Sequence, residues 1–305
     1  MTSREMLFIY LLVFLSVLLF FQIHHNTNLT QEIHHKVYSR QKTPQQTLIE
    51  KLTSFVAAPN SNSNCRLDDS VLKMYKIQHE NRVRLMKTIR NQGDENTGFA
   101  MLYNGIVPEI FCPSLIRVGN VDDGGKWVCN PVAMPANCVV MSLGVATDPS
   151  FEREIQLISD QKCSVQSYDK DDSVIDGFEK INAFFTKALI STRDNPETNE
   201  RSIRGEMKRL KIDRVEILKI DIEGSEFTVI PDLIDQATFC QILIEIHGKP
   251  KDVIDLIVKM AKKGYRLFSY EINGRFHFLS EYSFIHDDCL KQYEAVALDY
   301  YWHLV

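Results

Sequence analysis

The sequence has no surplus of basic residues. Its 40 acidic side chains outnumber the 35 lysines and arginines, which gives a formal net charge of −5. Proteins that bind nucleic acids usually present a basic face, so this balance argues against a nucleic-acid partner. No internal repeat or long low-complexity tract is present, and 44% hydrophobic with 25% charged residues is ordinary globular composition. A chain of 305 residues is long enough for one large domain with an appendage.

Cysteine pairs with the Cys-x-x-Cys spacing of structural zinc sites are also missing. We therefore expect no structural metal site. The seven cysteines fit a domain with some disulfides in an oxidising compartment. Their odd number leaves at least one thiol outside an intramolecular bridge, and the spacing does not fix the pairing. We expect one bridge within the trio that lies closest in sequence, Cys112, Cys129 and Cys138.

Charge is absent from one long stretch near the amino terminus. Residues 6–21 carry no charged side chain, and the apolar run reaches residue 23 if Gln22 is admitted. As a helix, such a run spans roughly 27 Å, enough for a thin bilayer. No small residues mark a cleavage site after it, which favours an uncleaved signal anchor over a signal peptide. We expect a single-pass type II protein of the Golgi or endoplasmic reticulum, with a cytosolic tail at 1–5, a transmembrane helix at 6–23, a stalk at 24–64 and a lumenal domain at 65–305.

The full glycine-rich fingerprint G-x-G-x-x-G is missing too, but part of its context is present. Residues 138–143 form an apolar strand pattern that ends at Gly144. Asp148 suits a helix N-cap, and Pro149 suits the first helical position. A strand, a glycine turn and a helix in this order are typical of the first crossover of a nucleotide-binding sheet, where the glycine lets a cofactor approach the backbone.

A second strand pattern, 164–168, ends at Asp169, 25 residues after Gly144. In nucleotide-binding sheets an acidic residue about 20 residues after the glycine turn binds the ribose hydroxyls of the cofactor. Asp171 and Asp172 come soon after it, so three carboxylates are candidates for this role. Asp169 lies nearest to the strand and is preferred.

Two further apolar runs end in polar side chains. Residues 215–220 and 241–246 have the pattern of buried parallel strands, whose carboxyl ends lie together at one edge of the sheet. Gly224 permits a sharp turn after the first of them, and Ser225 can open a helix. The candidate side chains at this edge are Asp221, Glu223, Glu245 and His247.

Strand and helix patterns alternate through the rest of the chain. They predict an α/β fold with a mostly parallel, Rossmann-like sheet and flanking helices. A helix at 69–90 precedes the sheet, and a hairpin with an Asp-Gly-Gly turn is expected within 117–129. The late strands 265–271 and 293–301 complete the sheet, the second as an antiparallel edge.

The motif Lys219-Ile220-Asp221-Ile222-Glu223-Gly224-Ser225-Glu226 resembles FkbM-type methyltransferases, in the animal group of methyltransferase-like proteins with an amino-terminal membrane anchor. The segments Ile244-Glu245-Ile246-His247, Ser142-Leu143-Gly144-Val145 and Asp123-Gly124-Gly125-Lys126-Trp127-Val128-Cys129 support it. The resemblance covers roughly residues 112–285. It implies a class I methyltransferase fold that uses S-adenosylmethionine, with methyl transfer typically to a hydroxyl oxygen. Ala146, where many such enzymes carry glycine, departs from the pattern.

The resemblance also implies roles for single residues. Gly144, Asp148, Asp169 and Asp221 would contact the cofactor, with Gly144 at its methionine part and Asp169 at its ribose. The transfer centre would consist of Asp221, Glu223, Glu245 and His247, with Asp221 or His247 as the general base. The expected acceptor is a glycan or another small hydroxylated molecule.

Two other functions fit part of the pattern. A lumenal glycosyltransferase would use Asp221 and Glu223 as a metal–nucleotide-sugar motif, but would leave Gly144 and Asp169 unused. A catalytically silent domain that binds a partner is the third interpretation. The carboxylates could also hold a divalent cation, but no recognisable loop of oxygen ligands surrounds them, so no metal is expected.

Overall fold

The computed structural model describes residues 67–92, 95–171, 178 and 181–305. The chain divides into Met1–Cys65 and Arg66–Val305, and every described residue belongs to the second unit. The predicted tail, the transmembrane helix at 6–23 and the stalk at 24–64 lie outside the described residues. In the described part of the chain, no helix is both long enough and apolar enough to cross a membrane.

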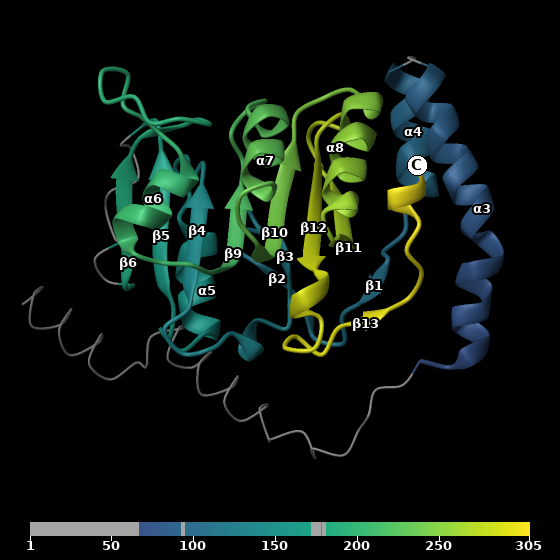
Figure 1. Ribbon diagram of the computed structural model, residues 1–305, viewed down its shortest axis with the longest axis horizontal. Helices are drawn as coiled ribbons and strands as arrows, with labels where there is room; N and C mark the ends of the chain where they lie inside the picture. The colour runs from purple at the N-terminus through teal and green to yellow at the C-terminus, as the bar shows by residue number, and fades with distance from the viewer. Residues whose placement is uncertain (1–66, 93–94, 172–177, 179–180) are drawn as a thin grey trace, which may run out of the picture. The chain divides into compact units, whose positions relative to one another are not determined.

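A seven-stranded sheet forms the centre of the unit (Figure 1). Its order is β11-β12-β10-β9-β4-β5-β6, and the five strands from β10 to β6 run parallel. β12 is antiparallel to both of its neighbours. The strands are β4 (Val139–Leu143), β5 (Ser164–Asp169), β6 (Ala183–Lys187), β9 (Val215–Ile220), β10 (Phe239–Ile246), β11 (Tyr265–Ile272) and β12 (Ser280–His286).

The direction in which strands are added reverses beside β4. From β4 the chain proceeds outward to β5 and β6 on one side, and β9 then pairs with the other side of β4. Open α/β sheets bind ligands at such a switch point, outside the carboxyl ends of the strands. Every residue of β9 and β10 is buried, as expected for central strands covered on both faces.

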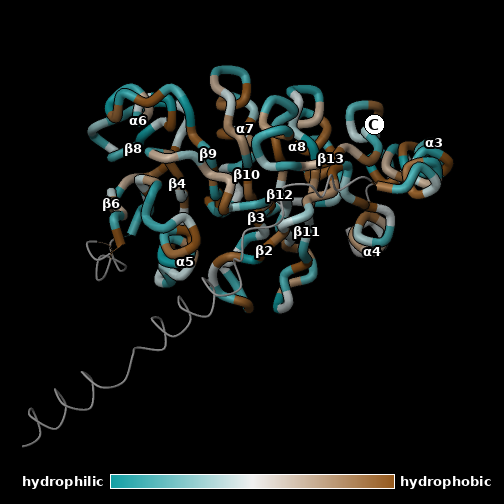
Figure 2. The backbone as a smooth tube through the Cα atoms, turned by 90° about the horizontal axis from the view of Figure 1, so that it is seen from below, coloured by the Kyte–Doolittle hydropathy of each residue, from teal (hydrophilic) through white to brown (hydrophobic). Residues whose placement is uncertain are grey.

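Helices and a hairpin cover the two faces of the sheet (Figures 1 and 2). One face carries α6 (Ile203–Leu210), α7 (Glu226–Ile234) and α8 (Pro250–Lys262); the other carries α5 (Ser150–Ile158) and the hairpin of β2 (Leu115–Val118) and β3 (Lys126–Cys129). Helices α3 (Asp69–Gln92) and α4 (Glu95–Gly105) pack against α8. The short elements are β1 (Ile110–Phe111), β7 (Leu189–Ile190), β8 (Glu200–Arg201), β13 (Val296–Ala297) and the 3-10 helices Pro131–Ala133, Asp287–Cys289 and Trp302–Leu304.

The α/β class, the mostly parallel sheet, the early helix and the hairpin are confirmed. The late strand prediction is wrong in one part. Within 293–301 only β13 is a strand, and it pairs with β1 in a separate two-stranded sheet. Tyr301 in this stretch donates its backbone N–H to the buried carboxylate of Glu109 rather than to a neighbouring strand. The antiparallel strand is β12, and it lies between β10 and β11 instead of at the edge.

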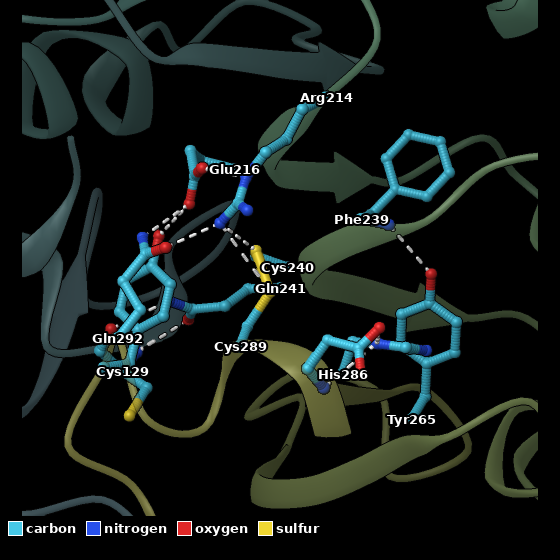
Figure 3. The surroundings of a disulfide bond; sticks show 12 residues. Cys129, Arg214, Glu216, Phe239, Cys240, Gln241, Tyr265, His286, Cys289 and Gln292 are labelled. Carbon is cyan, nitrogen blue, oxygen red and sulfur yellow. Dashed lines mark hydrogen bonds and ion pairs between the residues drawn. A yellow bond between two sulfur atoms is a disulfide. The ribbon is translucent and has the colours of Figure 1, made fainter. Parts of the chain in front are cut away.

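Three disulfides join the described cysteines: Cys112–Cys129, Cys138–Cys163 and Cys240–Cys289. The first confirms the expected bridge within the closest trio. Cys65 lies outside the described residues. Cys240–Cys289 ties the start of β10 to the chain after β12, and Figure 3 shows Arg214 and Glu216 beside it. This bridge therefore lies at the amino ends of the central strands, at the opposite edge from the carboxyl ends that form the site.

Candidate active site

A cavity of about 460 Å³ opens at the switch point of the sheet. Its walls come from the loops after β4, β5 and β9, together with β7. The lining residues are Gly144, Ala146, Thr147, Tyr168, Asp169, Lys170, Asp171, Ala188, Leu189, Ile190, Asp221, Ile222, Glu223 and Ser225. The volume falls within the range of small-molecule and cofactor sites. Four residues predicted from the sequence, Gly144, Asp169, Asp221 and Glu223, therefore meet in one cavity.

Gly144 is required by the packing of two loops against each other. Its φ is +77°, and a Cβ there would lie 1.7 Å from the backbone oxygen of Asp221. The Gly144 carbonyl accepts a hydrogen bond of 2.5 Å from Lys219 Nζ. Ala146, in place of the glycine of related patterns, also has a positive φ of 51°. That conformation costs an alanine roughly 1–2 kcal/mol, so the loop accommodates the departure with some loss of stability.

Asp169 organises the loop that follows β4. Its Oδ2 accepts hydrogen bonds of 2.8 Å from the backbone N–H groups of Val145 and Ala146. Its Oδ1 accepts one of 2.9 Å from the N–H of Asp171. A carboxylate has about four acceptor positions, so one is left for a ribose hydroxyl. The exposed Asp171 also lines the cavity and can accept a second hydroxyl, so the two acids fit the ribose of an adenosine cofactor.

Asp148 has a different role from the one predicted. It does not line the cavity. Its Oδ1 accepts from the backbone N–H of Ser150, and its Oδ2 accepts from the side-chain amide of Asn120. The helix begins one residue later than expected, with Pro149 as its N-cap. Asp148 thus joins the start of α5 to the hairpin loop.

The loop after β9 is held by a buried carboxylate. Glu226, the first residue of α7, is fully buried, and its two oxygens accept from the backbone N–H groups of Ile222 and Gly224. It also bonds Nδ1 of His247 at 3.1 Å. The predicted N-cap Ser225 makes no side-chain capping bond. The loop that carries Asp221 is therefore fixed from within by Glu226.

Beside the cavity, charged side chains gather over the ends of β9, β10 and β12. His247 Nε2 lies 3.9 Å from Asp221 Oδ1 and 3.4 Å from Glu223 Oε2. Lys126, 1% exposed, reaches this group from β3. Its Nζ lies 2.7 Å from the carboxylate of Glu281 and 4.0 Å from Asp221 Oδ2. The two oxygens of Asp221 thus face different partners, His247 on one side and Lys126 on the other.

Two buried ammonium groups keep Asp221 ionised. Burial alone raises the pKa of Asp221, but the charges of Lys126 and Lys219 outweigh it and hold that pKa below its usual value. Burial likewise opposes the charge of Lys126, yet the carboxylates of Glu281 and Asp221 raise its pKa above the ordinary value. At neutral pH the site therefore contains a carboxylate and an ammonium in close association.

Glu245 and His247 hold protons at neutral pH. Burial, reinforced by the neighbouring charges of Glu281 and Asp221, raises the pKa of Glu245 to about 8. Burial lowers the pKa of His247, but the hydrogen bond to Glu226 and the surrounding carboxylates raise it to about 9. Among the four predicted residues of the transfer centre, the half-buried Asp221 is thus kept in the form that can accept a proton.

Sequence reasoning missed three residues that build this site: Lys126, Lys219 and Glu226. The local pattern shows Lys126 only as part of a hairpin motif and Glu226 only as a helix start. Lys219, one of two charged residues in the buried strand 215–220, was the one available signal, because a charged residue in a buried strand needs a partner. The partner of Lys126 is 155 residues away, and no local pattern indicates it.

We compared the chain with known protein sequences and solved structures. A search of curated protein sequences gave no match. Three solved structures that a structural search matches are Geobacter metallireducens precorrin-6y C5,15-methyltransferase, M. capricolum TrmK in complex with S-adenosyl-homocysteine, and magnesium protoporphyrin IX methyltransferase from Synechocystis PCC 6803 with bound S-adenosylmethionine. Their identities to this chain are 11%, 13% and 11%, with TM-scores of 0.35, 0.32 and 0.33. The alignments cover 52%, 52% and 74% of this chain and 84%, 67% and 100% of the respective structures. Because these TM-scores are low, the family of this chain is assigned from the family model alone.

A family model described as a methyltransferase domain matches residues 57–286, well over half of the chain. The match includes the whole cavity and the charged group beside it. It confirms the predicted methyltransferase class and, with it, S-adenosylmethionine as the cofactor. The chain belongs to this methyltransferase-domain family.

Proposed function

We propose that this methyltransferase is a membrane-anchored enzyme of the FkbM type that methylates a hydroxyl oxygen on a glycan or another small hydroxylated molecule in the lumen of the secretory pathway. One observation carries the proposal. Asp221 belongs both to the wall of the cofactor cavity and to the charged group over the ends of β9 and β10. A cofactor in the cavity and an acceptor over the charged group would therefore meet at this carboxylate.

Methyl transfer to a hydroxyl requires that the methyl donor and the acceptor oxygen be aligned and that the hydroxyl lose its proton. S-adenosylmethionine, when bound, supplies a methyl group already activated by the sulfonium charge. The loops of Gly144 and Asp169, which line the cavity, would hold it in the orientation that transfer needs. An alcohol is a poor nucleophile, so a positioned proton acceptor contributes about 10²–10⁴-fold to the rate. Asp221 serves as that acceptor, because Lys126 and Lys219 keep it ionised.

The compartment is supported by the cysteines and by the amino-terminal run. Three disulfides in the described unit suit an oxidising lumen. The uncharged residues 6–21 suit a signal anchor. Protease added to intact microsomes should spare the domain from residue 65 onward. Digestion of that domain without detergent would contradict the lumenal placement.

Calorimetry of the full chain tests the cofactor site. We expect micromolar binding of S-adenosylmethionine and at least a tenfold loss of affinity in Asp169→Ala, since this change removes the ribose acceptor and frees two loop amides. Asp288→Ala is the matched control, an exposed aspartate at the opposite edge of the sheet. Binding of a UDP-sugar with manganese, in place of S-adenosylmethionine, would favour a glycosyltransferase. Binding of neither would leave a silent domain.

Acceptor identity is tested by transfer of labelled methyl groups. Incubation of the full chain with labelled S-adenosylmethionine and a pool of cell glycans should give a base-stable labelled ether. Label recovered only as a base-labile ester or on nitrogen would contradict transfer to a hydroxyl. Asp221→Asn should reduce incorporation by about 10²-fold or more, because the amide cannot accept the hydroxyl proton.

A further inference from the structure

Three potential ligand atoms converge beside the cofactor cavity, two of them from the lining residues Asp221 and Glu223. Nε2 of His247, a carboxylate oxygen of Asp221 and one of Glu223 all lie within 4.8 Å of one another. The imidazole nitrogen is 3.4 Å from Glu223 Oε2 and 3.9 Å from Asp221 Oδ1. Both distances exceed those of ordinary hydrogen bonds, roughly 2.7–3.2 Å. They approach the separation of two donors on one cation, roughly 3.0–3.5 Å when each bond is about 2.1 Å.

The imidazole is held in the orientation that a metal ligand needs. Its Nδ1 bonds to Glu226, which is fully buried and fixed by two backbone N–H groups. Metal-binding histidines almost always donate their other ring N–H to such a carboxylate or carbonyl, which sets the tautomer. In the part of the chain that the structure describes, no hydrogen bond reaches Nε2 of His247. That nitrogen therefore faces the two carboxylates, and a cation bound there would replace its proton.

The group of Asp221, Glu223 and His247 has a neighbouring group of acids that lies closer to the ammonium of Lys126. A second set of acids, Asp123, Glu245 and Glu281, lies on the other side of Asp221 and already has the buried ammonium of Lys126. On the His247 side, Glu223 faces the imidazole, and its own side chain is 74% exposed. Lys126 thus lies on one side of Asp221, whereas on the other side Asp221 and the exposed Glu223 face the imidazole of His247, whose proton a bound cation would replace.

We propose that Asp221, Glu223 and His247 bind a divalent first-row transition-metal cation. One imidazole and two carboxylates suit Mn²⁺ or Zn²⁺, since imidazole favours metals such as zinc and carboxylate favours metals such as manganese. Three protein ligands leave open positions, one of which takes the hydroxyl oxygen of the acceptor and lowers its pKa. This role in the acceptor site rests on the proposed function, whereas cation binding itself does not.

The proposal departs from the sequence-based expectation of no metal. The ligands follow two different strands, and the spacing from Glu223 to His247 is 24 residues, so no compact motif indicates them. Only the parallel pairing of β9 with β10 brings them together. The residue that completes the site, Glu226, is recognisable only from its contact with His247.

Titration of the full chain with Mn²⁺ alone, after removal of metals with a chelator, tests the site. The electron paramagnetic resonance signal of free Mn²⁺ reports the bound fraction. We expect one Mn²⁺ per chain, displaced by Zn²⁺, with affinity at least tenfold weaker in Glu223→Gln. Glu226→Gln should weaken binding by about 10–100-fold, the usual effect of losing the group that orients a histidine ligand.

Glu294→Gln is the matched control for Glu223→Gln. Both glutamates are exposed, and both have a left-handed backbone, with φ of 55° and 54°. The control should bind Mn²⁺ as the wild type does, and both variants should melt at the wild-type temperature. Absence of stoichiometric Mn²⁺ or Zn²⁺ binding, or equal affinities of the two variants, would overturn the site. Cation binding without S-adenosylmethionine binding would uphold this site and remove the proposed function.

Discussion

Lys126 offers the sharpest test of how the site is built. It is 1% exposed, and its ammonium lies 2.7 Å from the carboxylate of Glu281, which is 6% exposed. Lys126→Met keeps a long unbranched side chain and removes the charge. Breaking a buried ion pair by removing one partner costs about 3–5 kcal/mol, because the other charge remains buried without compensation. We expect the free energy of unfolding to fall by that amount at pH 8.

The loss should depend on pH in a defined direction. Burial already raises the pKa of Glu281, and removal of Lys126 raises it further. A carboxyl group whose pKa is higher in the folded state than in the unfolded state loses stability as pH rises through that range. The deficit of Lys126→Met should therefore shrink from pH 8 to pH 5, where Glu281 takes up a proton. Adding Glu281→Gln should restore at least half of the loss at pH 8, because it removes the uncompensated charge.

Urea unfolding of the full chain, with disulfides intact, measures these differences at both pH values. Lys73→Met is the control, an exposed lysine on α3 whose replacement should change the unfolding free energy by less than about 0.5 kcal/mol. A loss below about 1 kcal/mol in Lys126→Met, the size of a surface pair, would refute the reasoning. So would a deficit that is equal at pH 5 and pH 8, or a double variant less stable than the single one.

Three more predictions concern the backbone, a buried acid and a bridge. Gly144→Ala should abolish cofactor binding and lower the melting temperature, because a Cβ would lie 1.7 Å from a backbone oxygen; Gly274→Ala, with open space around it, should do neither. Burial raises the pKa of Glu109 to about 7, so the wild type loses stability as pH rises and this carboxyl ionises. The free energy of unfolding of Glu109→Gln, measured with urea, should therefore rise relative to that of the wild type by about 2–3 kcal/mol from pH 5 to pH 8. A difference that does not change with pH would contradict the raised pKa. Replacing Cys240 and Cys289 by serine opens a 49-residue connection and should cost about 4 kcal/mol, measured as a lower urea midpoint; a midpoint equal to that of the wild type would contradict it.

The central strands could be predicted because the residue pattern within each strand indicates that it is buried. Residues 215–220 and 241–246 are mostly apolar, four of six in each, which is the usual pattern of fully buried parallel strands. Gly144 and Asp169 could also be found from their spacing, since a parallel sheet places successive strand ends at one edge. The sequence therefore indicated three residues that line the cavity, Gly144, Asp169 and Asp221, whereas Asp148, predicted beside them, is not part of its lining.

The residues on the acceptor side of the site could not be predicted from the sequence, because their contacts join distant parts of the chain. Glu281 lies on β12, whose polar residues at buried positions hide the apolar pattern of a strand. Glu281 pairs with the buried Lys126. The sequence around either residue gives no sign of the other. The stretch 293–301 gave the opposite error: its alternating pattern resembled an edge strand, but only Val296 and Ala297 pair, with β1, and Tyr293 and Tyr301 are buried outside any strand.

The hairpin that carries Lys126 also sets an order of assembly. During synthesis this lysine leaves the ribosome before Asp221 and Glu281 do, and a domain generally folds as a unit. Until β12 is made, the hairpin lacks the glutamate that receives its ammonium at 2.7 Å. The chain therefore completes its active site only with one of its last strands. A nascent or truncated chain that ends before Ser280 would contain the cofactor cavity's residues but not the partner that anchors Lys126.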